Sequence, residues 1–147
     1  MIHLIIGGAR SGKSSFAESS VLAQQKSAQG IGYIATATAF DDEMSQRIVR
    51  HQQQRADQPW QLIECPLSLA SEIAALTDNK IYLVECLTLW LSNTLLQASE
   101  LYPDETTAID GYLHQQVKQL VNVIATTPHE LVLVSNEVGQ GIIPLGE

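Results

Sequence analysis

Short apolar runs alternate with longer, more polar segments along this 147-residue chain. Apolar runs without polar alternation are typical of strands that are buried on both faces of a parallel sheet. The pattern predicts five such strands, at residues 3–6, 31–36, 60–65, 81–86 and 130–135. We therefore expect a mainly parallel sheet of about five strands.

The segments between these runs are longer and suit helices. They predict helices at residues 12–26, 41–56, 67–76, 87–98 and 104–126. The last segment places Ile109, Leu113, Val117 and Leu120 at helical spacing. Strands that alternate with helices through short connections predict a doubly wound α/β fold. The sequence shows no internal repeat or long linker, so we expect a single domain over residues 1–147.

Composition narrows the class of protein. A hydrophobic content of 45% over this length is enough for one domain with a core. The net charge of -8 argues against binding of nucleic acid, whose phosphates require clustered Lys and Arg. No segment reaches the ~18 apolar residues of a membrane span. The first residues lack the basic region of a signal peptide, and Cys65 and Cys86 lie in apolar runs, so we expect reduced thiols in a cytoplasmic protein.

A phosphate-binding pattern, G-x-x-x-x-G-K-[ST], joins the first strand to the first helix. It comprises Gly7, Gly8, Ala9, Arg10, Ser11, Gly12, Lys13 and Ser14. Backbone N–H groups of such a loop point at one phosphate chain, and the helix that follows adds partial positive charge. We expect Lys13 to reach the β and γ phosphates and the Ser14 hydroxyl to bind Mg²⁺. The alternative is a glycine-rich turn that binds nothing; with the pattern, the predicted sheet is of the P-loop NTPase type.

Residues at the carboxyl ends of the predicted strands are further candidates, because ligands bind at that edge of an open α/β sheet. Thr36 follows the second strand and is a candidate nucleotide contact. Glu85 ends the fourth strand in a Walker-B-like position, where a carboxylate can serve Mg²⁺ beside the phosphates. The alternative for Glu85 is a surface carboxylate that binds no metal.

The polar helix predicted at residues 41–56 places Arg47, His51 and Arg55 on one face, at spacings of four residues. Flanking guanidinium groups favour the neutral, nucleophilic form of an imidazole, which suits attack on a phosphate. The alternative is a solvated helix face with an ordinary histidine. The remaining histidines show no spacing typical of a zinc site.

Five segments occur in one order with compatible spacing across the whole chain. They are GGARSGKS (7–14), YIATATAFDDEMSQRIVRH (33–51), Trp60-x3-Glu64-x-Pro66, ECLTLWLSN (85–93) and SNEVGQGIIP (135–144). Together they resemble the bifunctional adenosylcobinamide kinase/adenosylcobinamide-phosphate guanylyltransferase family. The patterns DDEM-x2-RI-x2-H and NEVG-x-GI-x-P are far more specific to that family than the phosphate loop.

The resemblance implies two reactions in assembly of the nucleotide loop of cobalamin. ATP or GTP phosphorylates adenosylcobinamide, and GTP then donates GMP to adenosylcobinamide phosphate through a guanylylated histidine. His51 corresponds to that histidine, and Lys13 is the second candidate catalytic residue. Glu64, in the segment Trp60-x3-Glu64-x-Pro66, is a further candidate nucleotide contact. The resemblance also implies a homo-oligomer, specifically a trimer, with Mg²⁺ as cofactor.

One departure from the family lies at the end of the chain. The family continues past the NEVG-x-GI-x-P pattern, so we expect this chain to lack a C-terminal helix–strand portion. Two alternatives to the bifunctional enzyme stay open. Another small-molecule P-loop kinase would leave the helix that bears His51 without a role, and an inactive nucleotide-binding module would catalyse neither reaction.

Overall fold

A computed structural model of the chain describes residues 2–7, 13–25, 30–36, 60–77 and 80–136. Its strands form one sheet in the order β1-β5-β4-β2-β3, and every neighbouring pair is parallel. The strands are β1 (Ile2–Gly7), β2 (Gly30–Ala35), β3 (Trp60–Glu64), β4 (Lys80–Glu85) and β5 (Glu130–Asn136). The predicted five-stranded parallel sheet is confirmed.

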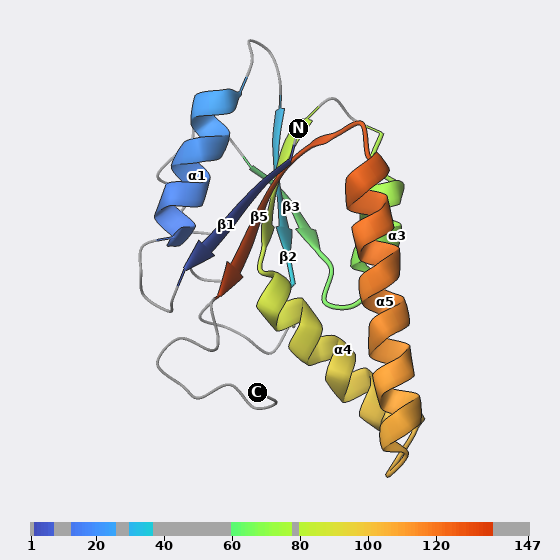
Figure 1. The fold of residues 1–147 in the computed structure, drawn as a ribbon. Helices are drawn as coiled ribbons and strands as arrows, with labels where there is room; N and C mark the ends of the chain where they lie inside the picture. Colours follow the sequence, from blue (N-terminus) through green and yellow to red (C-terminus); the bar gives the residue numbers. More distant parts are fainter. Residues whose placement is uncertain (1, 8–12, 26–29, 37–59, 78–79, 137–147) are drawn as a thin grey trace.

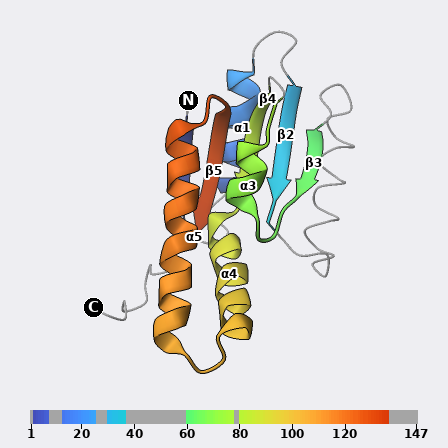
Figure 2. The same cartoon turned by 90° about the vertical axis from the view of Figure 1, so that its right-hand side faces the viewer.

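Helices cover both faces of this sheet. They are α1 (Lys13–Gln24), α3 (Leu69–Ala74), α4 (Leu87–Leu101) and α5 (Thr106–Thr126). Figures 1 and 2 show α1 on one face and α3 with α5 on the other, which gives the layered α/β arrangement that alternating elements predict. These helices confirm four of the five predicted helical segments; the segment at residues 41–56 lies outside the described residues.

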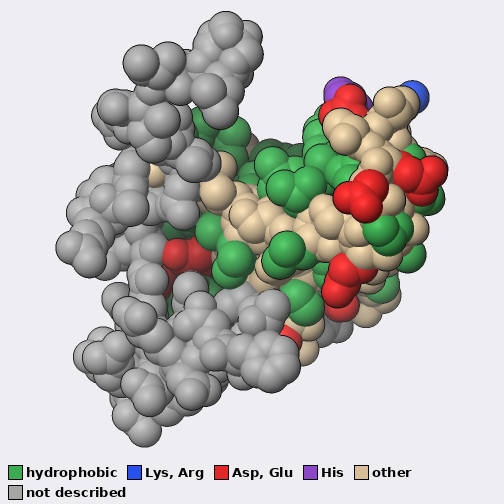
Figure 3. Space-filling model, turned by 90° about the horizontal axis from the view of Figure 1, so that it is seen from below, with side chains coloured by type: hydrophobic (Ala, Val, Ile, Leu, Met, Phe, Trp, Pro, Cys, Tyr) green, Lys and Arg blue, Asp and Glu red, His purple; other side chains and the backbone are tan. Residues whose placement is uncertain are grey.

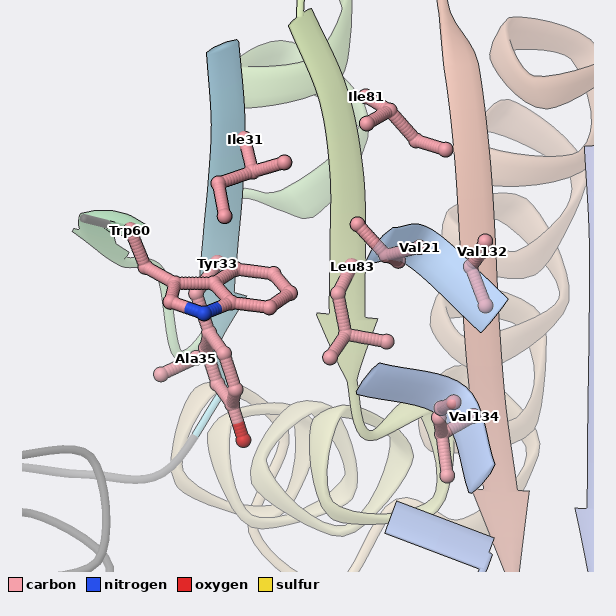
Figure 4. Packing of buried hydrophobic residues seen from close by; sticks show 10 residues of the cluster. Val21, Ile31, Tyr33, Ala35, Trp60, Ile81, Leu83, Val132 and Val134 are labelled. Atoms are coloured by element: carbon pink, nitrogen blue, oxygen red, sulfur yellow. The ribbon is translucent and has the colours of Figure 1, made fainter. Parts of the chain in front are cut away.

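The central strands β2, β4 and β5 divide their side chains between two hydrophobic clusters. Successive residues of a strand point to opposite faces, so Tyr33 and Ile34 belong to different clusters. On one face, Ala17 and Val21 of α1 pack against the strands. Figure 4 shows this cluster at close range. Burial on both faces explains why these strands are apolar runs without alternation.

Strand β1 is less buried than its sequence predicts. Its apolar run indicates a buried strand, yet Leu4 is 54% exposed and Ile6 is 59% exposed. Within the described residues, β1 lies at the edge of the sheet and pairs with β5 alone. The prediction of burial was wrong for this strand, because an apolar run indicates a strand but not its position in the sheet.

Helices α4 and α5 form a pair that extends past the carboxyl edge of the sheet (Figure 1). The Tyr112 hydroxyl donates a hydrogen bond to Gln97 Oε1 at 2.9 Å and so links the two helices. Asp104, in the connection between them, has a φ of 60°, a left-handed conformation that Asp tolerates better than most residues. Among the described helices, none has both the length and the hydrophobicity to cross a membrane.

Gly32 of β2 leaves room for the ring of Tyr82 on the neighbouring strand β4. A Cβ at this position would lie 2.5 Å from Cδ1 of Tyr82, whose ring is fully buried. We expect Gly32→Ala to lower the free energy of unfolding by about 1–3 kcal/mol through overpacking. Urea unfolding measures this change.

Gly111→Ala is the matched control, since Gly111 lies in α5 and a Cβ there would meet nothing within 4 Å. Alanine in a helix interior should raise stability by roughly 0.5–1 kcal/mol. Equal effects of the two substitutions would contradict the close contact between Gly32 and the Tyr82 ring.

Candidate functional site

The candidate site lies at the edge of the sheet where the strands end. Because all five strands are parallel, their carboxyl ends meet there. At this edge β1 ends at Gly7 and α1 begins at Lys13, so the two elements flank the phosphate-binding pattern as the sequence predicts. Figure 3 views the molecule from this end and shows hydrophobic and acidic side chains exposed side by side.

Glu85, the last residue of β4, is only 5% exposed. One strand, β5, lies between β4 and β1, which places the end of β4 about 10 Å from the end of β1 at ordinary strand spacing. Glu85 is therefore buried and not on the surface, and its binding of a metal stays a prediction. A buried carboxylate near a phosphate loop fits the oxygen ligands that Mg²⁺ takes.

The Tyr33 hydroxyl donates a hydrogen bond to Glu85 Oε2 at 3.0 Å. Tyr33 is itself 3% exposed, and its ring meets that of Trp60 edge to face at a centroid distance of 6.0 Å. Figure 4 shows the tyrosine ring running along the sheet toward the carboxyl ends of the strands. A buried polar group is costly without partners, so this donor helps Glu85 to stay buried.

Thr36 joins the ends of β2 and β4. Its hydroxyl donates to the carbonyl oxygen of Cys86 at 2.8 Å and accepts from the Cys86 N–H at 2.9 Å. The Thr36 N–H donates to the carbonyl oxygen of Glu85 at 3.0 Å. Thr36 thus fixes the backbone at Glu85 and Cys86. The contact of Thr36 with a nucleotide stays a prediction.

Asn93 connects this edge to α4. Its Nδ2 donates to the carbonyl oxygens of Thr36, at 2.8 Å, and Pro66, at 3.1 Å. The side chain therefore fixes the chain just after β2 and just after β3 to one helix. The positions of the strand ends in the sequence do not indicate this residue, since Asn93 lies on a helix and reaches the edge only through the fold. Its place in the ECLTLWLSN segment is the available sequence signal.

Two thiols, Cys65 and Cys86, lie beside these contacts, and no disulfide joins them. Burial raises the pKa of Cys65 to about 11, with a smaller contribution from the nearby charge of Glu72. Cys86 caps α4, where its sulfur accepts a hydrogen bond from the Leu89 N–H at 3.4 Å. The raised pKa keeps Cys65 a neutral thiol, which suits a core residue more than a nucleophile.

The structure brings several other predicted residues to the same edge. Glu64 ends β3, and Ala35 of β2 is in register with both Glu64 and Glu85. Lys13 and Ser14 are the first residues of α1. Gly8, Ala9, Arg10, Ser11, Gly12 and the Arg47–His51–Arg55 face lie outside the described residues, as does the helix predicted to bear that face.

Comparison with known proteins gives the family. A sequence profile described as cobinamide kinase / cobinamide phosphate guanyltransferase matches residues 3–147. The chain belongs to this family. The resemblance that the motifs indicate is thereby confirmed, and so is the classification as a bifunctional enzyme of the kinase and guanyltransferase type.

Two relatives show the extent of the similarity. The bifunctional adenosylcobalamin biosynthesis protein CobP of Pseudomonas aeruginosa is 42% identical over 148 residues, which cover 100% of this chain and 78% of the relative. The bifunctional adenosylcobalamin biosynthesis protein CobU of Escherichia coli is 36% identical, over 98% of this chain and 79% of the relative. Similarity therefore extends across the site and is not limited to the phosphate loop.

The contacts of Asn93 predict a stability effect. Asn93→Ala removes the donor from two carbonyl oxygens and should lower the free energy of unfolding by about 1–3 kcal/mol. Asn93→Asp should cost more, because a carboxylate would face the same two oxygens. Denaturant unfolding followed by circular dichroism measures both changes.

Ser99→Ala is the control for this series. Ser99 lies on the same helix, and its exposed hydroxyl donates to the Leu95 carbonyl oxygen at 3.0 Å. Its loss should change stability by less than about 0.5 kcal/mol. An Asn93→Ala protein as stable as Ser99→Ala would show that the two carbonyl contacts do not hold the edge together.

Proposed function

We propose that this member of the cobinamide kinase / cobinamide phosphate guanyltransferase family phosphorylates adenosylcobinamide and then transfers GMP to the product, both at the carboxyl edge of the sheet. The match of the family profile to residues 3–147 carries the proposal. The position of the phosphate-binding pattern between β1 and α1 supports it, since that is where such a loop binds phosphates.

Nucleotide binding is assigned to the loop at residues 7–14. Its N–H groups and Lys13 hold the triphosphate of ATP or GTP, and Arg10 and Ser11 contribute nearby. Ser14 and Glu85 are the residues that would hold Mg²⁺. When bound, Mg²⁺ would supply positive charge to the phosphate oxygens.

The kinase step forms one P–O bond and breaks another. A hydroxyl oxygen of the cobinamide side chain attacks the γ-phosphorus, the nucleoside diphosphate leaves, and the hydroxyl proton is released. Lys13 would neutralise charge on the transferred group. Positioning of the two substrates contributes much of the rate, because this chemistry needs little covalent help from the protein.

The guanylyl transfer proceeds in two steps. A nitrogen of the His51 imidazole attacks the α-phosphorus of GTP and expels pyrophosphate, which leaves GMP joined to His51 by a P–N bond. A phosphate oxygen of adenosylcobinamide phosphate then attacks the same phosphorus, breaks that bond and frees His51. The covalent intermediate divides one difficult transfer into two steps, each with a lower activation barrier.

The remaining expectations belong to this proposal as well. Thr36 and Glu64 contribute to the nucleotide site, the protein is a cytoplasmic homotrimer, and nucleic acid is not among its partners. The charge of -8 supports the last point, since it disfavours association with a polyanion.

Labelled GTP tests the proposal. We expect GTP labelled at the α-phosphate to leave acid-labile label on the wild-type protein. GTP labelled at the γ-phosphate should leave no label on His51, because that phosphate departs in pyrophosphate. In His51→Ala the α-label should fall to background, because the nucleophile is absent. The kinase reaction should persist in that variant, since its attacking oxygen belongs to the substrate.

His114→Ala is the matched control. This histidine lies exposed on α5, where Nδ1 is 3.0 Å from the Asp110 carbonyl oxygen, and its loss should leave labelling unchanged. Label retained by His51→Ala would refute His51 as the nucleophile. Transfer of the γ-phosphate without any α-label would favour a simple P-loop kinase, and neither reaction would favour a binding module.

A further inference from the structure

We propose that Tyr33 is a positioning residue that orients the Glu85 carboxylate toward the Mg²⁺ of the bound nucleotide. The inference rests on the proposed function, which assigns Glu85 to the metal. Its basis is the 3.0 Å hydrogen bond from the Tyr33 hydroxyl to Glu85 Oε2, which lies inside the protein. Tyr33 is not itself expected to touch either substrate.

The register of β2 and β4 explains how the contact forms. Tyr33 pairs with Leu83, and Ala35 pairs with Glu85 two residues further along. Since alternate residues share a face, all four side chains point to the same side of the sheet. Ala35 has only a methyl group, so the tyrosine ring can reach past it to the carboxylate, as Figure 4 shows for Tyr33 and Ala35. Tyr33 therefore contacts Glu85 diagonally across the two strands.

Both ends of this contact are held in place. The Tyr33 ring packs against Trp60 at an interplanar angle of 75° and belongs to the hydrophobic cluster on the α1 face. The backbone at Glu85 is held by the hydrogen bond from the Thr36 N–H. Glutamate side chains rotate about several bonds, and a donor held in a fixed position favours one orientation. The hydroxyl of Tyr33 provides that donor from a rigid ring.

Packing alone does not require the hydroxyl. A phenylalanine would fill the same space against Trp60, whereas only tyrosine brings a donor to the carboxylate. Partners of a metal-binding carboxylate that lie one shell out from the metal typically change metal affinity by about 10–100-fold when removed. We therefore expect the Tyr33 hydroxyl to affect the affinity for Mg²⁺, whereas the packing of its ring does not.

Nucleotide binding with and without Mg²⁺ tests this role independently of catalysis. A fluorescent GTP analogue is titrated into wild type and Tyr33→Phe, first with EDTA and then over a range of Mg²⁺ concentrations. We expect similar affinity in EDTA, and a Mg²⁺ concentration for half-maximal effect that is about 10–100-fold higher in Tyr33→Phe. A variant with the wild-type Mg²⁺ dependence would overturn the inference.

Tyr112→Phe is the matched control, because it removes a tyrosine hydroxyl bonded to Gln97 in the α4–α5 pair, away from the strand ends. Its Mg²⁺ dependence should equal that of wild type. Thermal unfolding of each variant separates a general loss of structure from the specific effect. If Tyr112→Phe shifted the Mg²⁺ dependence as much as Tyr33→Phe, the inference would be refuted.

A double-mutant cycle shows whether Tyr33 acts through Glu85. In a Glu85→Gln background, Tyr33→Phe should produce no further change in the Mg²⁺ dependence, because the carboxylate it orients is gone. Additive effects would overturn the positioning role, and so would wild-type binding that does not respond to Mg²⁺. Failure of GMP labelling with an intact Mg²⁺ effect would contradict the proposed function and leave the role of Tyr33 supported.

Discussion

Parallel pairing of the strands is the constraint on which the rest of this structure depends. A parallel connection must return the chain to the starting edge of the sheet, so a crossover separates each strand from the next. In the described residues, α1 packs on one face of the sheet, and α3 and α5 pack on the other. The carboxyl ends of all five strands therefore lie at the same edge of the sheet, and so do the residues that follow them.

That edge is assembled from polar groups that the protein itself satisfies. Thr36 binds both backbone groups of Cys86, and Asn93 binds the carbonyl oxygens of Thr36 and Pro66. Buried polar groups with complete partners rigidify a structure, whereas incomplete ones destabilise it. The ends of β2, β3 and β4 are therefore held together before any ligand binds, and the Glu85 carboxylate projects from a fixed backbone.

The same edge offers a simple account of how one protein serves two transfer reactions. Both reactions use a nucleoside triphosphate. We propose that the same phosphate loop binds it in each reaction. In the proposed mechanism they differ in the phosphorus attacked: a hydroxyl of the substrate would attack the γ-phosphorus, and His51 would attack the α-phosphorus. A common site for the nucleotide would let both reactions take place at one edge of the described sheet.

The sequence by itself determined the elements of the fold, their parallel class and the phosphate-binding pattern. These features depend on local properties: apolar runs, helical spacing, and glycines at fixed positions. It also placed Glu85 at a strand end, and its motifs identified the family. The roles of Lys13, Ser14 and His51 stay predictions from those motifs.

Only the tertiary structure decided which side chains meet. The strand order places β1 at the edge of the described sheet, which exposes Leu4 and Ile6 although their run is apolar. It also brings Tyr33 to Glu85, across 52 positions of sequence, and Asn93 to Thr36, across 57. Such contacts depend on the register between strands and on the packing of α4. Those are properties of the whole fold, and no local segment of the sequence specifies them.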